Sequence, residues 1–199
     1  MNKLVEIISR IPRIWLFAAA GLIQIFFIAM MIGDRVYILR TGTDVVLKTR
    51  AVDPRDYLRG DYVTLAYAIE SVESGALKDT LSKGKGMAVF VKLAKGPDGF
   101  HKAVSAHVEP VQVAAGEVLI RGFLINGGNC GDARQGFCSS IQLAYGFEKF
   151  FVPQGEGREI EKARNEGKLA VIAAVTSGGK AAIKRLLIDG NPVYDEPLF

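Results

Sequence analysis

An uncharged apolar run near the N-terminus limits what this chain can fold into. Residues 14–32 read IWLFAAAGLIQIFFIAMMI, and Gln24 is the only strongly polar side chain of the run. A helix of this length crosses a hydrocarbon core of about 30 Å, whereas a surface helix of a soluble domain needs a polar face. The run therefore predicts a transmembrane segment over residues 14–33, between a short tail (residues 1–13) and a domain over residues 34–199.

The same run is typical of an uncleaved signal anchor. It is longer than the apolar region of a cleaved signal peptide, and the GDRVY that follows has no small-x-small cleavage site. Basic residues are almost balanced on its two sides, so the positive-inside rule does not decide the orientation. Because the tail is too short to fold, and because two cysteines in the larger part favour an oxidising compartment, we expect a cytoplasmic N-terminus and an exported C-terminal domain.

Gln24 lies on one helical face with small and apolar side chains. A helix places it beside Phe17, Ala20, Gly21 and Ile28. Small residues around one polar group are typical of a surface that packs against another transmembrane helix. The alternative is that a lone glutamine is tolerated facing lipid.

The two cysteines, Cys130 and Cys138, lie eight residues apart in the glycine-rich stretch NGGNCGDARQGFCSS. They form either a disulfide that closes a surface loop or a pair of unrelated thiols. A loop this short gains about 2–3 kcal/mol from the crosslink. No histidine stands close enough to complete a zinc site, so we expect no metal.

Charge and glycine patterns exclude two further function classes. The net charge is +4, and basic residues are interspersed with acidic ones instead of forming a patch, so we expect no nucleic-acid partner. The glycines around Cys130 lack the spacing and the following Lys-Ser/Thr of a phosphate loop, so we expect no cofactor.

After the apolar run, turn signals recur every eight to fifteen residues between short β-like segments. The sequence predicts a mainly β domain that closes as a sandwich or an irregular barrel, with one short helix in QGEGREIEKARNEGK. No internal repeat is apparent. The expected strands cover residues 45–50, 61–69, 87–94, 100–113, 117–125, 141–151, 169–176, 181–188 and 192–194.

Residues 60–67 read GDYVTLAY and match every fixed position of a known signature: Gly60, Asp61, Tyr62, Leu65 and Tyr67. This stretch, YGFEKFFVPQGEGREIE and the terminal VYDEPLF together resemble the GDYXXLXY family of bacterial membrane-anchored proteins. The resemblance implies a membrane-anchored bacterial protein, and together with the orientation inferred from the tail and the cysteines we expect an inner-membrane protein whose domain is periplasmic. It supplies no activity.

The signature itself favours a turn that is followed directly by a strand. Alternation turns Leu65 and Tyr67 toward the core, whereas Arg55, Arg59, Asp61 and Tyr62 lie at the preceding corner. That corner is either a rigid structural turn or a lip that binds a partner or ligand.

Two function classes follow. The first is a non-enzymatic binding or assembly subunit that works with the lipid bilayer and other integral membrane proteins. The alternative is a membrane-tethered hydrolase distantly like signal peptidase I, which needs a hydroxyl nucleophile and a neutral lysine. The expected Ser-Met is absent, and only Thr41, Thr43, Lys92 and Lys95 are available. No catalytic residue is therefore expected, and His101 and His107 read as exposed residues on one face of a strand.

Overall fold

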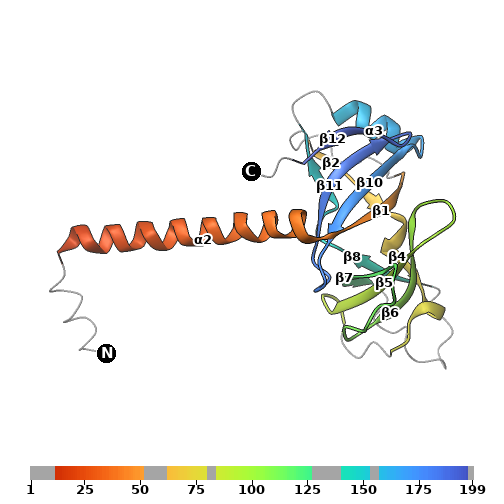
Figure 1. Cartoon of the computed structure of the whole chain (residues 1–199), viewed down its shortest axis with the longest axis horizontal. Coiled ribbons are helices and arrows are strands. Elements are labelled where there is room, and N and C mark those ends of the chain that lie inside the picture. The colour runs from red at the N-terminus through yellow and green to blue at the C-terminus, as the bar shows by residue number, and fades with distance from the viewer. Residues whose placement is uncertain (1–11, 52–61, 80–83, 127–139, 153–156, 197–199) are drawn as a thin grey trace. The chain divides into compact units, whose positions relative to one another are not determined.

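The computed structural model describes residues 12–51, 62–79, 84–126, 140–152 and 157–196. The chain divides into two compact units, with the boundary between Tyr37 and Ile38. Figure 1 labels the elements of both units.

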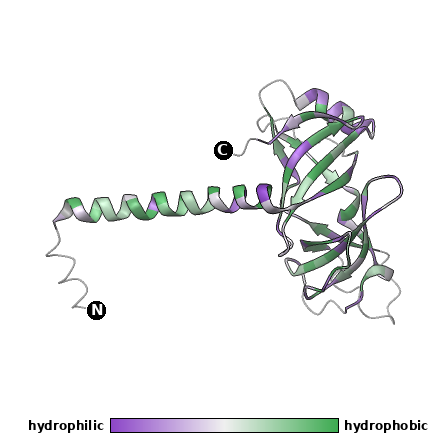
Figure 2. Cartoon of the chain, in the orientation of Figure 1, coloured by the Kyte–Doolittle hydropathy of each residue, from purple (hydrophilic) through white to green (hydrophobic). Residues whose placement is uncertain are grey.

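The apolar run forms most of helix α2, Arg13–Thr41. Its large apolar side chains between Ile14 and Ile32 are exposed, and it is the one helix in the described ranges that is long and apolar enough to cross a membrane. Apolar colour follows the helix along most of its length in Figure 2. The helix continues past residue 33, where the predicted span ends. At its end, Ile38 and Leu39 are buried with Ala174 and Ala182 in the second unit.

The second unit is mainly β, as predicted. All strand pairings within its sheets are antiparallel, and the strand orders are β12-β11-β10-β1-β3, β4-β8-β7-β5-β6 and β2-β9. The strands are β1 (Thr43–Arg50), β2 (Tyr62–Thr64), β3 (Ala66–Tyr67), β4 (Ser71–Glu73), β5 (Ala88–Lys95), β6 (His101–His107), β7 (Glu117–Asn126), β8 (Ser140–Ala144), β9 (Lys149–Phe151), β10 (Leu169–Val175), β11 (Ala181–Ile188) and β12 (Asn191–Asp195).

One buried core joins the two five-stranded sheets. It contains alternate residues of β1 and β10 from the first sheet and of β5 and β7 from the second, such as Leu47, Val171, Val91 and Ile120. This is the inward-facing alternation of a strand with one face on a core. Within the described residues the sheets are not closed into a barrel.

Two predicted strands are interrupted in the structure. The segment 61–69 separates into β2, β3 and the 3-10 helix η1 (Ala68–Glu70), and the segment 141–151 separates into β8 and β9. Each interruption lies at a Tyr-x-x-Glu sequence, where the glutamate accepts the N–H of the tyrosine three residues earlier. A second 3-10 helix, η2, covers Ser74–Ala76.

The predicted short helix is α3, Gly157–Asn165. It buries Ile160 and Ala163 in the core. Gly167, with a φ of 71°, follows the helix, and the N–H groups of Gly167 and Lys168 bond to the carbonyls of Arg164 and Ala163. This pair of bonds is a Schellman motif, which explains why the helix ends at the glycine.

Candidate functional site

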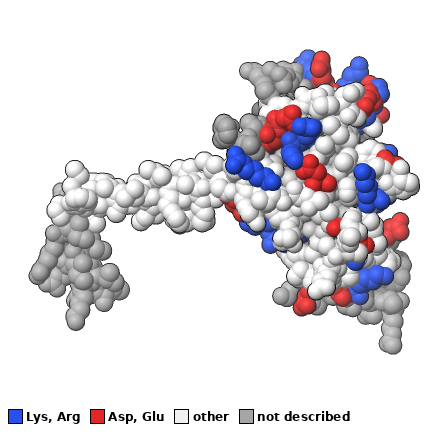
Figure 3. Space-filling view, in the orientation of Figure 1, with Lys and Arg blue, Asp and Glu red and all other residues white. Residues whose placement is uncertain are grey.

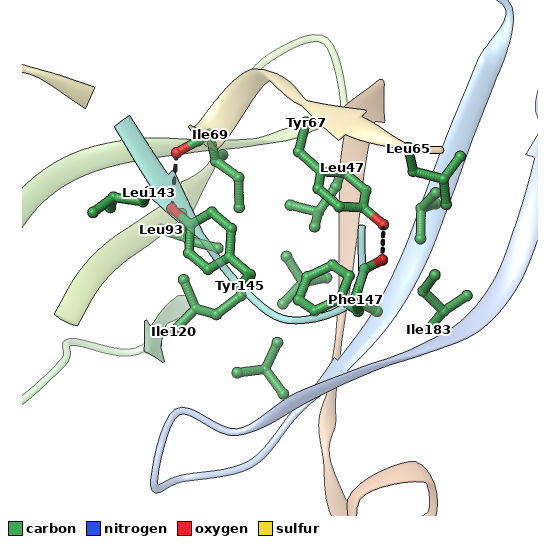
Figure 4. Close-up of a cluster of buried hydrophobic side chains, with 14 of the residues drawn as sticks. Leu47, Leu65, Tyr67, Ile69, Leu93, Ile120, Leu143, Tyr145, Phe147 and Ile183 are labelled. Atoms are coloured by element: carbon green, nitrogen blue, oxygen red, sulfur yellow. Dashed lines mark hydrogen bonds between the residues drawn. The ribbon is translucent and has the colours of Figure 1, made fainter. Parts of the chain in front are cut away.

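Two buried tyrosines meet where the interrupted strands lie side by side. The Tyr67 hydroxyl donates to the Phe147 carbonyl at 2.9 Å, and the Tyr145 hydroxyl donates to the Ile69 carbonyl at 2.8 Å. Figure 4 shows both bonds among buried aliphatic side chains. The rings of Tyr67 and Phe147 pack with their centroids 4.9 Å apart. Each tyrosine therefore satisfies a buried carbonyl of the other segment.

A glutamate closes each of the two bends. Glu70 Oε1 accepts the Tyr67 N–H at 3.0 Å, and Glu148 accepts the N–H groups of Tyr145 and Gly146. The two segments are also joined directly, because the Leu65 N–H donates to the Glu148 carbonyl at 2.7 Å. Bonds from backbone N–H groups to a carboxylate are charge-assisted, so they hold the bends firmly.

Arg50 links the first bend to β1. Its Nε donates to the Tyr67 carbonyl at 3.2 Å, and its Nη2 lies 3.3 Å from Glu70 Oε2. The Arg50 side chain is about half exposed, whereas that of Glu70 is largely buried. Together with the two tyrosines and Glu148, these residues form one cluster at the two bends.

Burial controls the protonation of this cluster. It raises the pKa of Tyr67 and of Tyr145 well above the usual value of a phenol, and the charges of Glu70 and Glu148 add to the effect. Burial also raises the pKa of Glu70, and the Glu148 charge adds to that, while the Tyr67 N–H and Arg50 oppose it. The tyrosines therefore remain neutral hydrogen-bond donors. A phenol that must stay protonated and is already bonded to a carbonyl is a structural group.

The structure places two signature residues in the core. Leu65 and Tyr67 are fully buried, as the alternation predicted. The backbone of Tyr62 pairs with Phe151 in the β2–β9 sheet. Gly60, Asp61, Arg55 and Arg59 lie outside the described residues, so the binding lip stays a prediction. Cys130 and Cys138 lie outside them too, and the disulfide stays a prediction as well.

The expectation for the two histidines is wrong. A β-bulge in β6 leaves Val104 without a partner, since Lys92 pairs with Ser105 and Leu93 with Ala103. One extra residue reverses the alternation, so His101 and His107 lie on opposite faces. His101 is buried, and its Nδ1 accepts the Val46 N–H at 3.1 Å. Burial lowers its pKa.

On the other face of β6, Ser105 Oγ lies 2.9 Å from His107 Nε2, and His107 Nδ1 lies 3.8 Å from Asp79 Oδ2. The contacts follow the order of a hydrolase triad, but 3.8 Å is too long for a hydrogen bond. Ser105 is only 6% exposed. Asp79 Oδ2 instead accepts the Val108 N–H at 2.9 Å. The geometry does not prepare Ser105 as a nucleophile.

Lys92, one of the two lysines considered for protease chemistry, forms an ion pair with a glutamate. Lys92 Nζ lies 3.1 Å from Glu117 Oε2 on the neighbouring strand. This ion pair directs the Lys92 ammonium to a carboxylate of β7. Thr43 begins β1 and pairs with Val175. Nothing in this arrangement favours the hydrolase alternative.

Sequence reasoning did not single out Arg50, Glu70, Tyr145 or Glu148. A signal for three of them is present, because LAYAIE at residues 65–70 recurs as LAYGFE at residues 143–148. The expectation of no internal repeat is therefore wrong at this point. Arg50 has no such signal, since it is one of several basic residues around the signature.

Comparison with known families agrees with the resemblance. The family described as GDYXXLXY protein matches residues 24–186, which cover most of α2 and nearly all of the β unit. Neither the curated proteins nor the solved structures contain a match. The matched range spans both the signature and its second, related sequence. The chain belongs to the GDYXXLXY family.

Proposed function

We propose that this protein is a single-pass protein of the bacterial inner membrane whose β unit is a non-enzymatic binding or assembly subunit of a membrane-protein complex. The observation that carries the proposal is α2. The large apolar side chains of its first part, among them Phe17, Leu22, Ile25 and Met31, are exposed within the chain. Exposed apolar surface of this extent needs lipid or another protein to cover it.

The face around Gln24 supports a protein partner within the membrane. An unpaired amide in hydrocarbon is costly, and a neighbouring helix is the usual source of its partner. Ala20 and Gly21 lie one turn before Gln24, and a Cβ added at Gly21 meets nothing beyond the helix's own backbone within 4 Å. Small side chains next to a polar one let two helix backbones approach closely.

The rest of the chain supports a binding role more than a chemical one. The two fixed signature positions whose side chains the structure describes, Leu65 and Tyr67, are buried in the core, and the Tyr67 hydroxyl is bonded to the backbone. Lys, Arg, Asp and Glu are interspersed over the face of the β unit seen in Figure 3, without one large patch of either sign. The exported side of the membrane is the proposed location of this unit.

A photo-crosslinking amino acid at position 24 tests the proposal in the native membrane. The matched control carries the same group at position 22, which lies on the opposite face of the helix. We expect position 24 to capture an integral membrane protein and position 22 to capture mainly lipid. If both positions capture only lipid, and an affinity purification of the full chain retains no membrane protein, the assembly role is wrong.

The hydrolase alternative has its own test. A fluorophosphonate probe labels activated serines, and we expect it to leave the full-length protein unlabelled in detergent. Labelling that disappears in Ser105→Ala would overturn the non-enzymatic proposal.

A further inference from the structure

We propose that the β unit is a pair of equivalent half-domains, linked in one chain and interlocked by strand exchange as two subunits of a symmetric dimer would be. The first half contains β1 to β6, and the second contains β7 to β11. The recurrence of LAYAIE as LAYGFE, 78 residues apart, is the trace of this equivalence in the sequence.

The strands that flank the two copies of this sequence pair with each other as if related by a local two-fold axis. Tyr62 pairs with Phe151 in β2–β9, and Glu73 pairs with Ser140 in β4–β8. With the offset of 78, Tyr62 of the first half corresponds to Ser140 of the second, and Glu73 corresponds to Phe151. The pairing of Tyr62 with Phe151 therefore becomes the pairing of Ser140 with Glu73 when the two halves are exchanged. The reciprocal bonds of Tyr67 and Tyr145 obey the same relation. A contact in which each side uses the same residues is isologous.

The hairpins β5–β6 and β10–β11 match residue by residue with an offset of 80. Both carry a β-bulge at the same place, with Val104 skipped in β6 and Lys184 in β11. Both turns end on a glycine of positive φ, 83° at Gly99 and 81° at Gly179. The hydrogen bonds of the two turns also correspond: the Gly99 N–H donates to the Gly96 carbonyl, and the Gly179 N–H donates to the Thr176 carbonyl.

The remaining strands are exchanged between the halves. β1 pairs with β10 of the second half, and β7 pairs with β5 of the first. In the core, Leu47 opposes Val171, and its counterpart Ile120 opposes Val91. The pairing of β1 with β3 corresponds in turn to that of β7 with β8. In the described chain, every sheet pairing except β11–β12 has its image.

The core also balances large and small residues between the halves. Leu93 pairs with Ala103 in the first half, and the counterpart pair is Ala173 with Ile183 in the second. Each pair contains one bulky residue and one alanine, but on opposite strands. Because interiors are close-packed, such a reversal keeps the filled volume similar while the sequence diverges.

The halves differ at their edges and at one charge. Helix α3 and strand β12 have no counterpart among the described residues of the first half. Arg50, at the end of β1, corresponds to Phe123 in β7, so the ion pair to Glu70 belongs to the first bend. These differences explain why strand patterns alone do not expose the repeat.

A transplanted core pair tests the equivalence. Leu93→Ala and Ala103→Ile together give the first half the core pair of the second. We expect each single variant to lower the unfolding midpoint of the full-length protein, and the double variant to recover most of that loss. If the double variant is no more stable than the sum of the two single losses predicts, the two pairs do not occupy equivalent sites.

A cleavage experiment tests the interlocking. A protease recognition sequence is inserted after Gln112, an exposed residue in the connection between β6 and β7. After cutting, we expect the two pieces to stay together in native detergent and to separate only in denaturant, with the uncut insertion variant as control. Pieces that part under native conditions would show that the halves do not hold each other by exchanged strands.

Discussion

Tyr67 and Tyr145 each place a hydroxyl on the backbone of the other's bend, at 2.9 and 2.8 Å. The family signature therefore ends on a tyrosine whose hydroxyl is bonded to a second, related sequence, which lies 78 residues later. Both hydroxyls are buried, and both bonds cross the same contact between the two segments.

Tyr67→Phe removes one of these bonds and leaves the Phe147 carbonyl without its donor. We expect a loss of about 1–2 kcal/mol in the free energy of unfolding. Denaturant unfolding of the full-length protein in detergent measures it. Tyr145→Phe is the matched variant, and a loss in one variant with none in the other contradicts the reciprocal role.

Glu148→Gln tests the second bend. Glutamine keeps one acceptor oxygen, but it places an NH₂ group where Glu148 Oε2 accepts the Gly146 N–H at 3.0 Å. We expect a loss of about 1–3 kcal/mol in the free energy of unfolding. The control is Glu73→Gln on the exposed end of β4, which we expect to change stability by less than about 0.5 kcal/mol.

His101 gives the unfolding free energy a defined pH dependence. Burial lowers its pKa below 6.5 in the folded state, so between these two values the unfolded chain binds more protons. Its contribution to stability is complete above pH 6.5 and is lost as the pH falls through the lowered pKa. We expect His101→Gln to reduce the slope of stability against pH in this window. Unfolding midpoints measured in steps from pH 5 to 7.5 check it, and an unchanged slope would assign the dependence to other groups.

The two corresponding turn glycines should differ in their tolerance of alanine. Both have a positive φ, so Gly99→Ala costs about 1 kcal/mol from backbone strain. At Gly179 an added Cβ also lies 3.0 Å from the Arg121 nitrogen, whose N–H bonds to the Gly179 carbonyl at 2.9 Å. We expect Gly179→Ala to lower the thermal midpoint more than Gly99→Ala does. Equal shifts would mean that the turn relaxes away from β7.

Much of the fold follows from local patterns in the sequence. The apolar run specifies α2, the alternation in residues 87–94 specifies β5, and the charged segment between glycines specifies α3. These features depend on residue types whose periodicity reflects one buried face. The inward positions of Leu65 and Tyr67 follow in the same way.

The features that the sequence did not predict depend on residues that are distant in the sequence but adjacent in the fold. The bulge at Val104 has no signal in KAVSAH, because it is determined by the register of β6 against β5, and the face of His101 changes with it. The bends at Glu70 and Glu148 interrupt segments whose apolar alternation continues across them. The partner of Arg50 is known only once β1 and β3 lie side by side.

The pairing of β1 with β10 also determines when β1 can join its sheet during synthesis. Residues 43–48, which follow directly after α2, hydrogen-bond with residues 170–175. During synthesis the backbone N–H and C=O groups of residues 43–48 that bond to β10 therefore stay without their partners until nearly the whole chain has been made. Such long-range pairing slows folding and leaves an open strand edge available to other chains. Any chain that terminates before β10 leaves residues 43–48 of β1 without their partner strand, and such an unpaired edge favours aggregation.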